Sequence, residues 1–194
     1  MDLKERFGKF EKDSYPSMAE LFKRLVEEGQ KPGMMIISCA DSRVVPELVT
    51  SSLPGEIFVI RNIANMVPPY DSVFSSVPSA VDYAVGHLKV SKLVVLGHSQ
   101  CGGVKALLEG GVEGHLGKWL ELGGEVLEQL ESREFSSFEE RQRAAEIVNV
   151  EVQLARLKGY PCVQKALERG ELVLEGWYYQ LVPPSLLPVA LWKS

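Results

Sequence analysis

The sequence predicts an α/β fold in which helices flank a mostly parallel central β-sheet. Short apolar runs of strand length alternate with longer stretches of helical periodicity, and turn residues separate them. Strands that are apolar on both faces are typical of parallel sheets covered by helices. The 194 residues, 45% hydrophobic and 24% charged, suit a single domain over 1–194 with a substantial core.

Four strands are predicted, each from a short apolar run bounded by turn residues. They cover residues 33–38, 56–61, 92–96 and 172–179, and the last of them is expected to end the sheet. The apolar stretch Leu186–Trp192 cannot form a regular helix, because prolines surround and interrupt it. It is expected to cover either an edge of the sheet or a neighbouring subunit.

Helices are predicted wherever apolar residues recur at spacings of three and four. Two N-terminal helices, over 2–13 and 17–28, are expected to be interrupted at Tyr15-Pro16-Ser17. The segment 62–76 lacks a clean period and is predicted to be a loop. The remaining helices are expected at 44–50, 78–88, from near 102, 116–131, 138–158 and 161–169.

Charge and apolar pattern exclude several classes of function. A net charge of −5 argues against nucleic-acid binding, which needs clustered Lys and Arg. The longest apolar runs fall short of the about 20 residues of a membrane helix, and no secretory signal is visible. A cytoplasmic protein is expected. The odd count of three Cys fits a reducing compartment, with Cys162 predicted to be a packed free thiol.

Two predicted strands end in ligands for a soft metal. Cys39-Ala40-Asp41-Ser42-Arg43 follows the first strand, and His98-Ser99-Gln100-Cys101-Gly102-Gly103 follows the third. In parallel sheets ligands bind outside the carboxyl ends of the strands. Three ligands, Cys39, His98 and Cys101, with no obvious fourth predict a catalytic zinc that has one open position. The alternative is a buried, redox-active thiol pair, but the usual Cys-x-x-Cys spacing is absent.

Asp41 and Arg43 admit two interpretations. They could form an ion pair that only braces the loop, or Arg43 could hold Asp41 beside the open zinc position. Asp41 could also be the fourth ligand in a closed state. Two thiolates and a neutral imidazole cancel the charge of zinc, so bound water should be less acidic than in an all-His site, where its pKa is ~7. Activity is therefore expected to rise with pH.

These residues resemble the β-class carbonic anhydrases, in particular their plant-type branch. The family signatures Cys-x-Asp-x-Arg and His-x-x-Cys-Gly-Gly stand here at residues 39–43 and 98–103. The segments Arg61–Asp71, Glu146–Val150 and Gly176–Tyr179 are also similar to the plant-type pattern. The resemblance covers most of residues 15–182.

The resemblance implies zinc-dependent, reversible hydration of carbon dioxide to bicarbonate and a proton, by attack of zinc-bound hydroxide. It implies one zinc per subunit, a homodimer or dimer-based tetramer with dimer-forming N-terminal helices, and a substrate pocket at the dimer interface. By this resemblance Cys39, His98 and Cys101 bind the metal, and Asp41 with Arg43 is the catalytic dyad. The expected substrate-binding residues are Gln30, Phe58, Ile63, Tyr83 and Gly102.

The residues alone support the pocket less strongly. Gln30 would pass as a turn residue and Phe58, Ile63 and Tyr83 as core, whereas free N–H groups near Gly102 would suit a small anionic product. No His stands out as a proton shuttle, since His87 and His115 are predicted to be surface or packing residues. Two alternatives stay open: hydrolysis of carbonyl sulfide or carbon disulfide, and a zinc-binding interaction module without activity.

Overall fold

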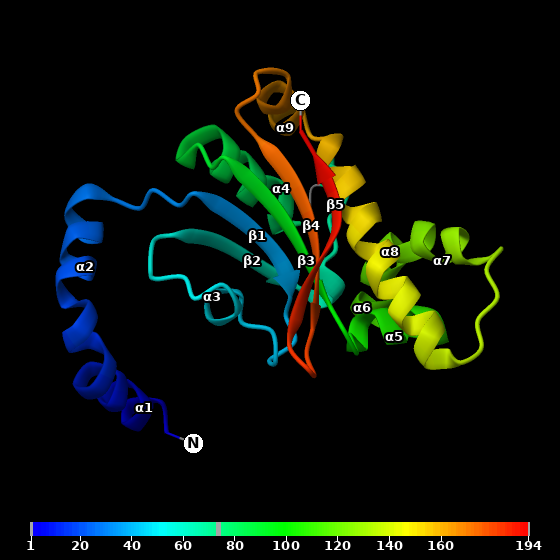
Figure 1. Ribbon diagram of the computed structural model, residues 1–194, viewed down its shortest axis with the longest axis horizontal. Coiled ribbons are helices and arrows are strands. Elements are labelled where there is room, and N and C mark those ends of the chain that lie inside the picture. The colour runs from blue at the N-terminus through cyan, green and yellow to red at the C-terminus, as the bar shows by residue number, and fades with distance from the viewer. Residues whose placement is uncertain (1, 73–74, 194) are drawn as a thin grey trace.

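The computed structural model describes residues 2–72 and 75–193, and it confirms the predicted α/β class (Figure 1). The sheet has the strand order β2-β1-β3-β4-β5. Strands β1 to β4 are parallel, and β5 runs antiparallel to β4. The bounds are Met34–Cys39 for β1, Ile57–Asn62 for β2, Lys92–His98 for β3, Val173–Gln180 for β4 and Ser185–Trp192 for β5.

The helices lie around the sheet and at the carboxyl ends of its parallel strands (Figure 1). Their bounds are α1 Leu3–Lys9, α2 Tyr15–Glu28, α3 Pro46–Val49, α4 Ser76–Asp82, α5 Gly102–Glu109, α6 Gly114–Leu120, α7 Gly124–Leu130, α8 Phe138–Lys158 and α9 Pro161–Glu168. Short π-helical or 3-10 segments join some of them: η1 Phe10–Ser14, η2 Ile63–Asn65, η3 Tyr83–Leu88 and η4 Glu121–Gly123.

The two faces of the sheet are covered unequally. Alternate side chains of a strand point to opposite faces, so Met35 and Ile37 pack under α4, α8 and α9 in the main core. Ile36 points the other way, into a smaller cluster with Val44, Val94 and Leu96. Val49 of α3 lies beside Ile36 at this second face, and among the described residues the cluster there has fewer buried members than the main core.

The N-terminal arm, defined as residues 3–28, projects away from the body of the molecule (Figure 1). None of its helical segments contains a buried residue. The predicted interruption at Tyr15-Pro16-Ser17 is wrong, because the arm stays helical through the π-turn of η1. That turn shifts the hydrogen-bond register just before Pro16, which has no N–H to donate and stands in the first turn of α2.

Two further predictions need correction. The single helix expected over 116–131 is divided into α6, the 3-10 turn η4 and α7. Gly123, at the end of that turn, lies so close to Leu107 and Met66 that a side chain there would clash. The strand at 172–179 does not end the sheet, because the apolar tail adds β5 to the edge of β4. Pro188 is accommodated there by a shift of register, which is where an edge strand tolerates proline.

Other boundaries are close to those predicted. Helix α8 covers residues 138–158 as expected, and Ser137 caps it by accepting a hydrogen bond from the N–H of Glu140 at 3.2 Å. Part of the predicted 62–76 loop, residues 73–74, lies outside the described residues. Among the helices of residues 2–72 and 75–193, none has the length and apolarity needed to cross a membrane.

Candidate metal centre and substrate pocket

The candidate metal centre lies where β1 and β3 end. These strands are adjacent and parallel, with Ser38 opposite Leu96, so Cys39 and His98 leave the sheet at the same edge. Gln100 has a φ of 56°, a tight turn that brings Cys101 back to the start of α5. The ligand atoms of Cys39, His98 and Cys101 all lie within 4.8 Å of one another, and all three residues are buried.

The hydrogen bonding of His98 fits a metal ligand. Its Nδ1 lies 2.9 Å from the carbonyl oxygen of Ser99, which can only accept, so Nδ1 carries the proton and donates. The lone pair is then on Nε2, which is buried and has no hydrogen-bond partner among the described residues. A buried polar atom without a partner is costly. Zinc bound by one imidazole and two thiolates would satisfy it.

The pKa values of the two thiols shift in opposite directions. Their sulfurs are 3.8 Å apart, and the hydrogen bond from Cys101 lowers the pKa of Cys39 to about 4 against the effect of burial. The same contact, and then burial, raises the pKa of Cys101, while the backbone N–H groups of Gly103 and Val104 act in the opposite direction. Zinc binding therefore requires release of a proton from this pair.

Asp41 and Arg43 form a two-point ion pair beside these ligands. Arg43 donates from Nε to Oδ1 at 2.9 Å and from Nη2 to Oδ2 at 2.7 Å, and its backbone N–H also donates to Oδ1. A further bond from Nη2 to the carbonyl of Gln100 ties the pair to the loop of the other motif. These hydrogen bonds hold the pKa of Asp41 below its usual range. The alternative role of Asp41 as a fourth ligand stays a prediction, since it requires the carboxylate to leave Arg43.

Arg61 braces the loop that carries Cys39. Its Nε donates to the carbonyl oxygen of Cys39 at 3.0 Å, and its Nη2 donates to that of Asp41 at 2.7 Å. The N–H of Ala40 also donates to the carbonyl of Asn62. The sequence alone assigns Arg61 no role, and its only signal is its position in a segment that resembles the plant-type pattern.

Glu146 is a second residue that sequence reasoning did not place in the site. Its Oε1 accepts from the N–H of Cys101 at 2.8 Å, and its Oε2 accepts from the hydroxyl of Tyr178 at 2.8 Å. Gln142 donates to the same Oε1. Burial raises the pKa of Glu146, although these hydrogen bonds oppose that effect. Within the sequence, its only signal was its position inside a segment that resembles the plant-type pattern.

The predicted substrate-binding residues fall into two groups. Ile63 and Gly102 lie at the metal end, since Ile63 packs so closely on Gly103 that a side chain at 103 would clash. Phe58 lies opposite Met35, four residues before Cys39, and its ring is 5.9 Å from that of Tyr83.

Gln30 is exposed and precedes β1, so it lies before the end of that strand opposite Cys39. Tyr83 is 45% exposed, and the ring of His87 packs against it. One chain therefore does not bring all the predicted pocket residues to its own metal ligands.

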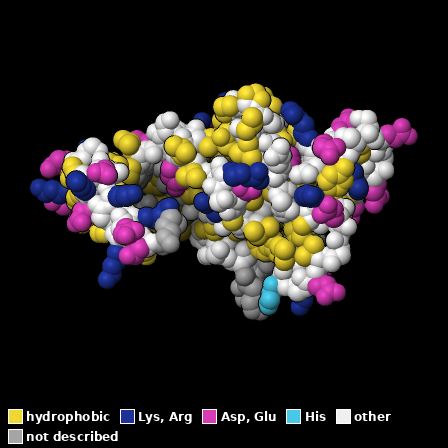
Figure 2. Space-filling view, turned by 90° about the horizontal axis from the view of Figure 1, so that it is seen from below, with side chains coloured by type: hydrophobic (Ala, Val, Ile, Leu, Met, Phe, Trp, Pro, Cys, Tyr) yellow, Lys and Arg dark blue, Asp and Glu magenta, His cyan; other side chains and the backbone are white. Residues whose placement is uncertain are grey.

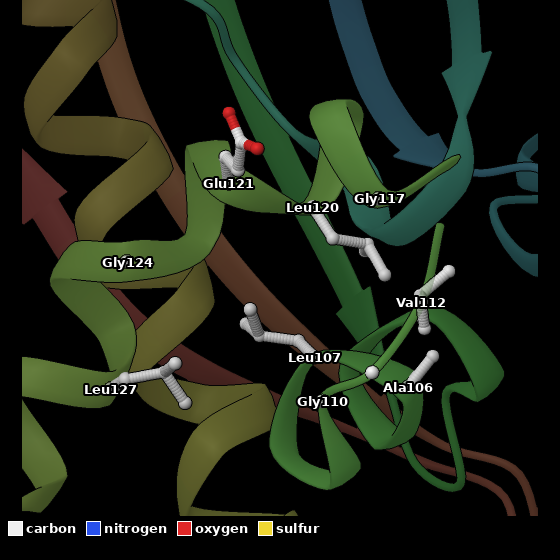
Figure 3. Close-up of a pocket in the computed structure, with 10 residues that line it drawn as sticks. Ala106, Leu107, Gly110, Val112, Gly117, Leu120, Glu121, Gly124 and Leu127 are labelled. Carbon is white, nitrogen blue, oxygen red and sulfur yellow. The ribbon is translucent and has the colours of Figure 1, made fainter. Parts of the chain in front are cut away.

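A separate cavity of about 250 Å³ lies between α5, α6 and α7. Figure 3 shows Leu107, Leu120, Val112 and Ala106 around the same space, with the carboxylate of Glu121 turned away from them. Glycines at 110, 111, 117 and 124 form much of its wall. None of the candidate ligand, dyad or pocket residues lines it.

A parallel sheet that delivers two thiols and an imidazole to one point, beside an oriented carboxylate, defines a zinc-dependent α/β enzyme. The family model described as "Carbonic anhydrase" matches residues 34–184. The chain belongs to the carbonic anhydrase family, in its β class, and β-carbonic anhydrases are zinc enzymes. This confirms the resemblance seen in the two motifs.

Individual relatives agree with this assignment. A carbonic anhydrase of Pseudomonas aeruginosa is 41% identical over 93% of this chain and 83% of its own length. The chloroplastic β carbonic anhydrase 5 of Arabidopsis thaliana is 36% identical over 93% of this chain but only 62% of its own length. A tetrameric β-carbonic anhydrase of Sordaria macrospora superimposes with a TM-score of 0.83, at 29% identity, over 96% of this chain and 93% of that one.

Proposed function

We propose that this chain hydrates carbon dioxide reversibly, with zinc held by Cys39, His98 and Cys101. The observation that carries the proposal is the unpartnered Nε2 of His98, which faces two thiols within 4.8 Å in a chain of this family. Zinc, when bound, lowers the pKa of a water molecule and so makes a nucleophile available near neutral pH. The remaining steps fall to residues of the chain.

Asp41 and Arg43 act as the proton-handling pair. Arg43 occupies both carboxylate oxygens and keeps Asp41 ionised, so Asp41 accepts a hydrogen bond from the attacking water and orients it. The bond from Arg43 to the carbonyl of Gln100 fixes the pair relative to Cys101. The N–H of Gly102, at the start of α5, is available to a bicarbonate oxygen.

The substrate pocket requires a second copy of the chain. Phe58 and Tyr83 pack against each other, and Gln30 precedes β1 at the end opposite Cys39; we call these three residues the distant patch. In a dimer, the distant patch of one subunit completes the site that contains the metal ligands of the other subunit. Ile63, which belongs to the same subunit as those ligands, supplies an apolar wall. Phe58, Ile63 and Tyr83 then surround a substrate without a net dipole, and Gln30 donates to one of its oxygens.

The uncovered surfaces support this assembly. Phe7 is 59% exposed and Val26 is 84% exposed on the arm, and Figure 2 shows hydrophobic side chains there between charged ones. The less covered face of the sheet carries a hollow of about 170 Å³, lined by apolar residues that include Ile36 and Trp177. We infer a homodimer or a dimer-based tetramer; the Sordaria relative is described as tetrameric. A reducing compartment, the cytoplasm, would keep both ligand thiols reduced.

Zinc analysis and stopped-flow carbon dioxide hydration test the function. We expect one zinc per subunit and activity that rises with pH. Cys39→Ser should lose zinc and activity together, whereas Asp41→Asn should keep zinc and lose about 100-fold in kcat/KM. Asp71→Asn, the same change at an exposed carboxylate outside the two motifs, serves as the matched control.

The alternatives give different results. A protein that binds zinc but hydrates neither carbon dioxide nor carbon disulfide would be an interaction module. A higher kcat/KM for carbon disulfide than for carbon dioxide would identify the other hydrolytic activity. Either result would contradict the proposed function.

A further inference from the structure

Helix α8 buries a row of polar side chains that the main core does not require. Glu146, Asn149 and Gln153 are 3%, 1% and 0% exposed, and their spacing of three and four places them on one side of the helix. Buried polar groups are costly unless they are hydrogen-bonded. Each of these side chains bonds to the backbone of a loop at the site, so we call the three residues the α8 ladder.

The first member of the ladder holds the metal loop. Glu146 accepts the hydrogen bond from the backbone N–H of Cys101 at 2.8 Å. The next two members hold residues 62–67, which we call the wall loop because it carries Ile63. Asn149 donates from Nδ2 to the carbonyl oxygen of Ala64 at 2.9 Å, and Gln153 accepts from the N–H of Val67 at 2.7 Å.

The amide directions in the ladder are mutually determined. A backbone N–H can only donate, so the oxygen of Gln153 must face Val67 and its NH₂ group must face the other way. That NH₂ donates to Oδ1 of Asn149 at 2.8 Å. The NH₂ group of Asn149 therefore faces Ala64 and donates to its carbonyl oxygen. A single arrangement satisfies all these groups.

The wall loop needs such support because its backbone is strained. Ala64 and Asn65 have φ values of 59° and 45°, and consecutive non-glycine residues rarely adopt this left-handed conformation. Strain of this kind persists only where surrounding contacts enforce it, and it is typical of functional sites. Besides the ladder, Trp119 holds the loop by donating from Nε1 to the carbonyl oxygen of Ile63 at 2.9 Å.

We propose that Asn149 is a positioning residue for the hydration reaction, acting through the strained wall loop to place Ile63 relative to the metal ligands. This inference rests on the proposed function. Glu146 and Asn149 lie three residues apart, about 4.5 Å along the helix axis, so one rigid helix sets the spacing between the metal loop and the wall loop.

Two substitutions at 149 separate positioning from stability. Asn149→Ala removes both hydrogen bonds, whereas Asn149→Asp keeps the shape and the acceptor for Gln153 but loses the donor to Ala64. Leu157→Val is the matched control, because Leu157 is fully buried on the same helix and lies in the main core two turns beyond Asn149. Trp119→Phe, at a less buried position, releases the wall loop from its other side without opening the core.

We expect both Asn149 variants to lower kcat/KM for carbon dioxide about tenfold and kcat less than threefold, because proton export also limits kcat. Trp119→Phe should move kcat/KM in the same direction by about threefold. Zinc content and the visible absorption spectrum of the cobalt-substituted protein should stay as in the parent, since the metal loop is untouched. Leu157→Val should lower the unfolding temperature and leave kcat/KM unchanged.

Unchanged kcat/KM in the Asn149 and Trp119 variants, measured well below their unfolding temperatures, would overturn the proposal. An altered cobalt spectrum or lost zinc in the Asn149 variants would also overturn it, because the effect would then reach the metal loop rather than the wall. Failure of the proposed function looks different, since the parent and Leu157→Val would then be inactive too.

Discussion

A mixing experiment tests whether the pocket is shared between subunits. The perturbation is a pair of inactive variants: Cys39→Ser removes a metal ligand, and a Gln30→Ala, Tyr83→Ala double variant removes the distant patch. Phe58 of that patch is level with Met35, four residues before Cys39. At ~3.3 Å per residue this is about 13 Å along the strand, too far for one small substrate to contact both ends within a chain.

The magnitude follows from dimer geometry. When equal amounts of the two variants are dissociated and allowed to reassociate, about half of the dimers contain one of each. In a mixed dimer one site combines the intact metal end of the double variant with the intact patch of Cys39→Ser, while the other site carries both lesions. One working site in half of the dimers gives about a quarter of the parent activity.

Stopped-flow carbon dioxide hydration before and after reassociation gives the readout. Each variant alone, taken through the same treatment, supplies the baseline, and sedimentation equilibrium verifies that each still forms dimers. If each site lay within a single chain, every chain in a mixed dimer would be defective. Activity that stays at the baseline after mixed dimers have formed would therefore refute the shared pocket.

Three further predictions concern stability. Gly103→Ala would place a Cβ 2.7 Å from Cγ2 of Ile63. Although alanine is the better helix former, the free energy of unfolding measured by chemical denaturation should fall by about 1–3 kcal/mol. Unchanged stability would show that Ile63 moves aside without cost. Burial raises the pKa of Glu175, but the hydrogen bonds from Lys92 and Trp177, together with the charge of Lys92, outweigh burial and leave that pKa below its usual value. Glu175→Gln should therefore lower the free energy of unfolding at pH 7 by less than about 1 kcal/mol, seen as a slightly lower unfolding temperature. The difference in stability between variant and parent should vanish as the pH falls below about 4. A difference that persists in acid would contradict the ion pair. Truncation before Ser185 removes β5 and exposes the β4 edge, so calorimetry should show unfolding at least about 10 °C lower, with aggregation; an unchanged transition would mean that β5 adds nothing.

The sequence predicts the strands and helices that depend on residues close together in the chain. Apolar runs ending at Cys39 and His98 identify the strands, and parallel pairing then brings both motifs to one edge of the sheet. Helix α8 is found from its period. Local pattern also explains the errors. The prolines near residue 188 argue against a helix correctly, but they do not exclude an edge strand that tolerates a shift of register.

The sequence does not reveal hydrogen bonds between residues that are far apart in the chain. Glu146 lies 45 positions from Cys101, and Asn149 lies 85 positions from Ala64. On a helix whose apolar spacing already predicts burial, these polar residues look like its solvated side. Tertiary packing alone shows that they face loops. The proposed sharing of the pocket between two subunits is not visible in the sequence either, since Phe58 and Tyr83 fit the pattern of core residues equally well.

If the proposed dimer forms through the N-terminal arm, the rate of catalysis depends on protein concentration. None of the helical segments of the arm buries a residue within its own chain, so packing against a partner would supply the stability that these segments lack alone. If the partner also supplies part of each pocket, dilution below the dimer dissociation constant removes activity and arm helicity together. Specific activity, ordinarily a constant of an enzyme, would then fall on dilution and recover on concentration.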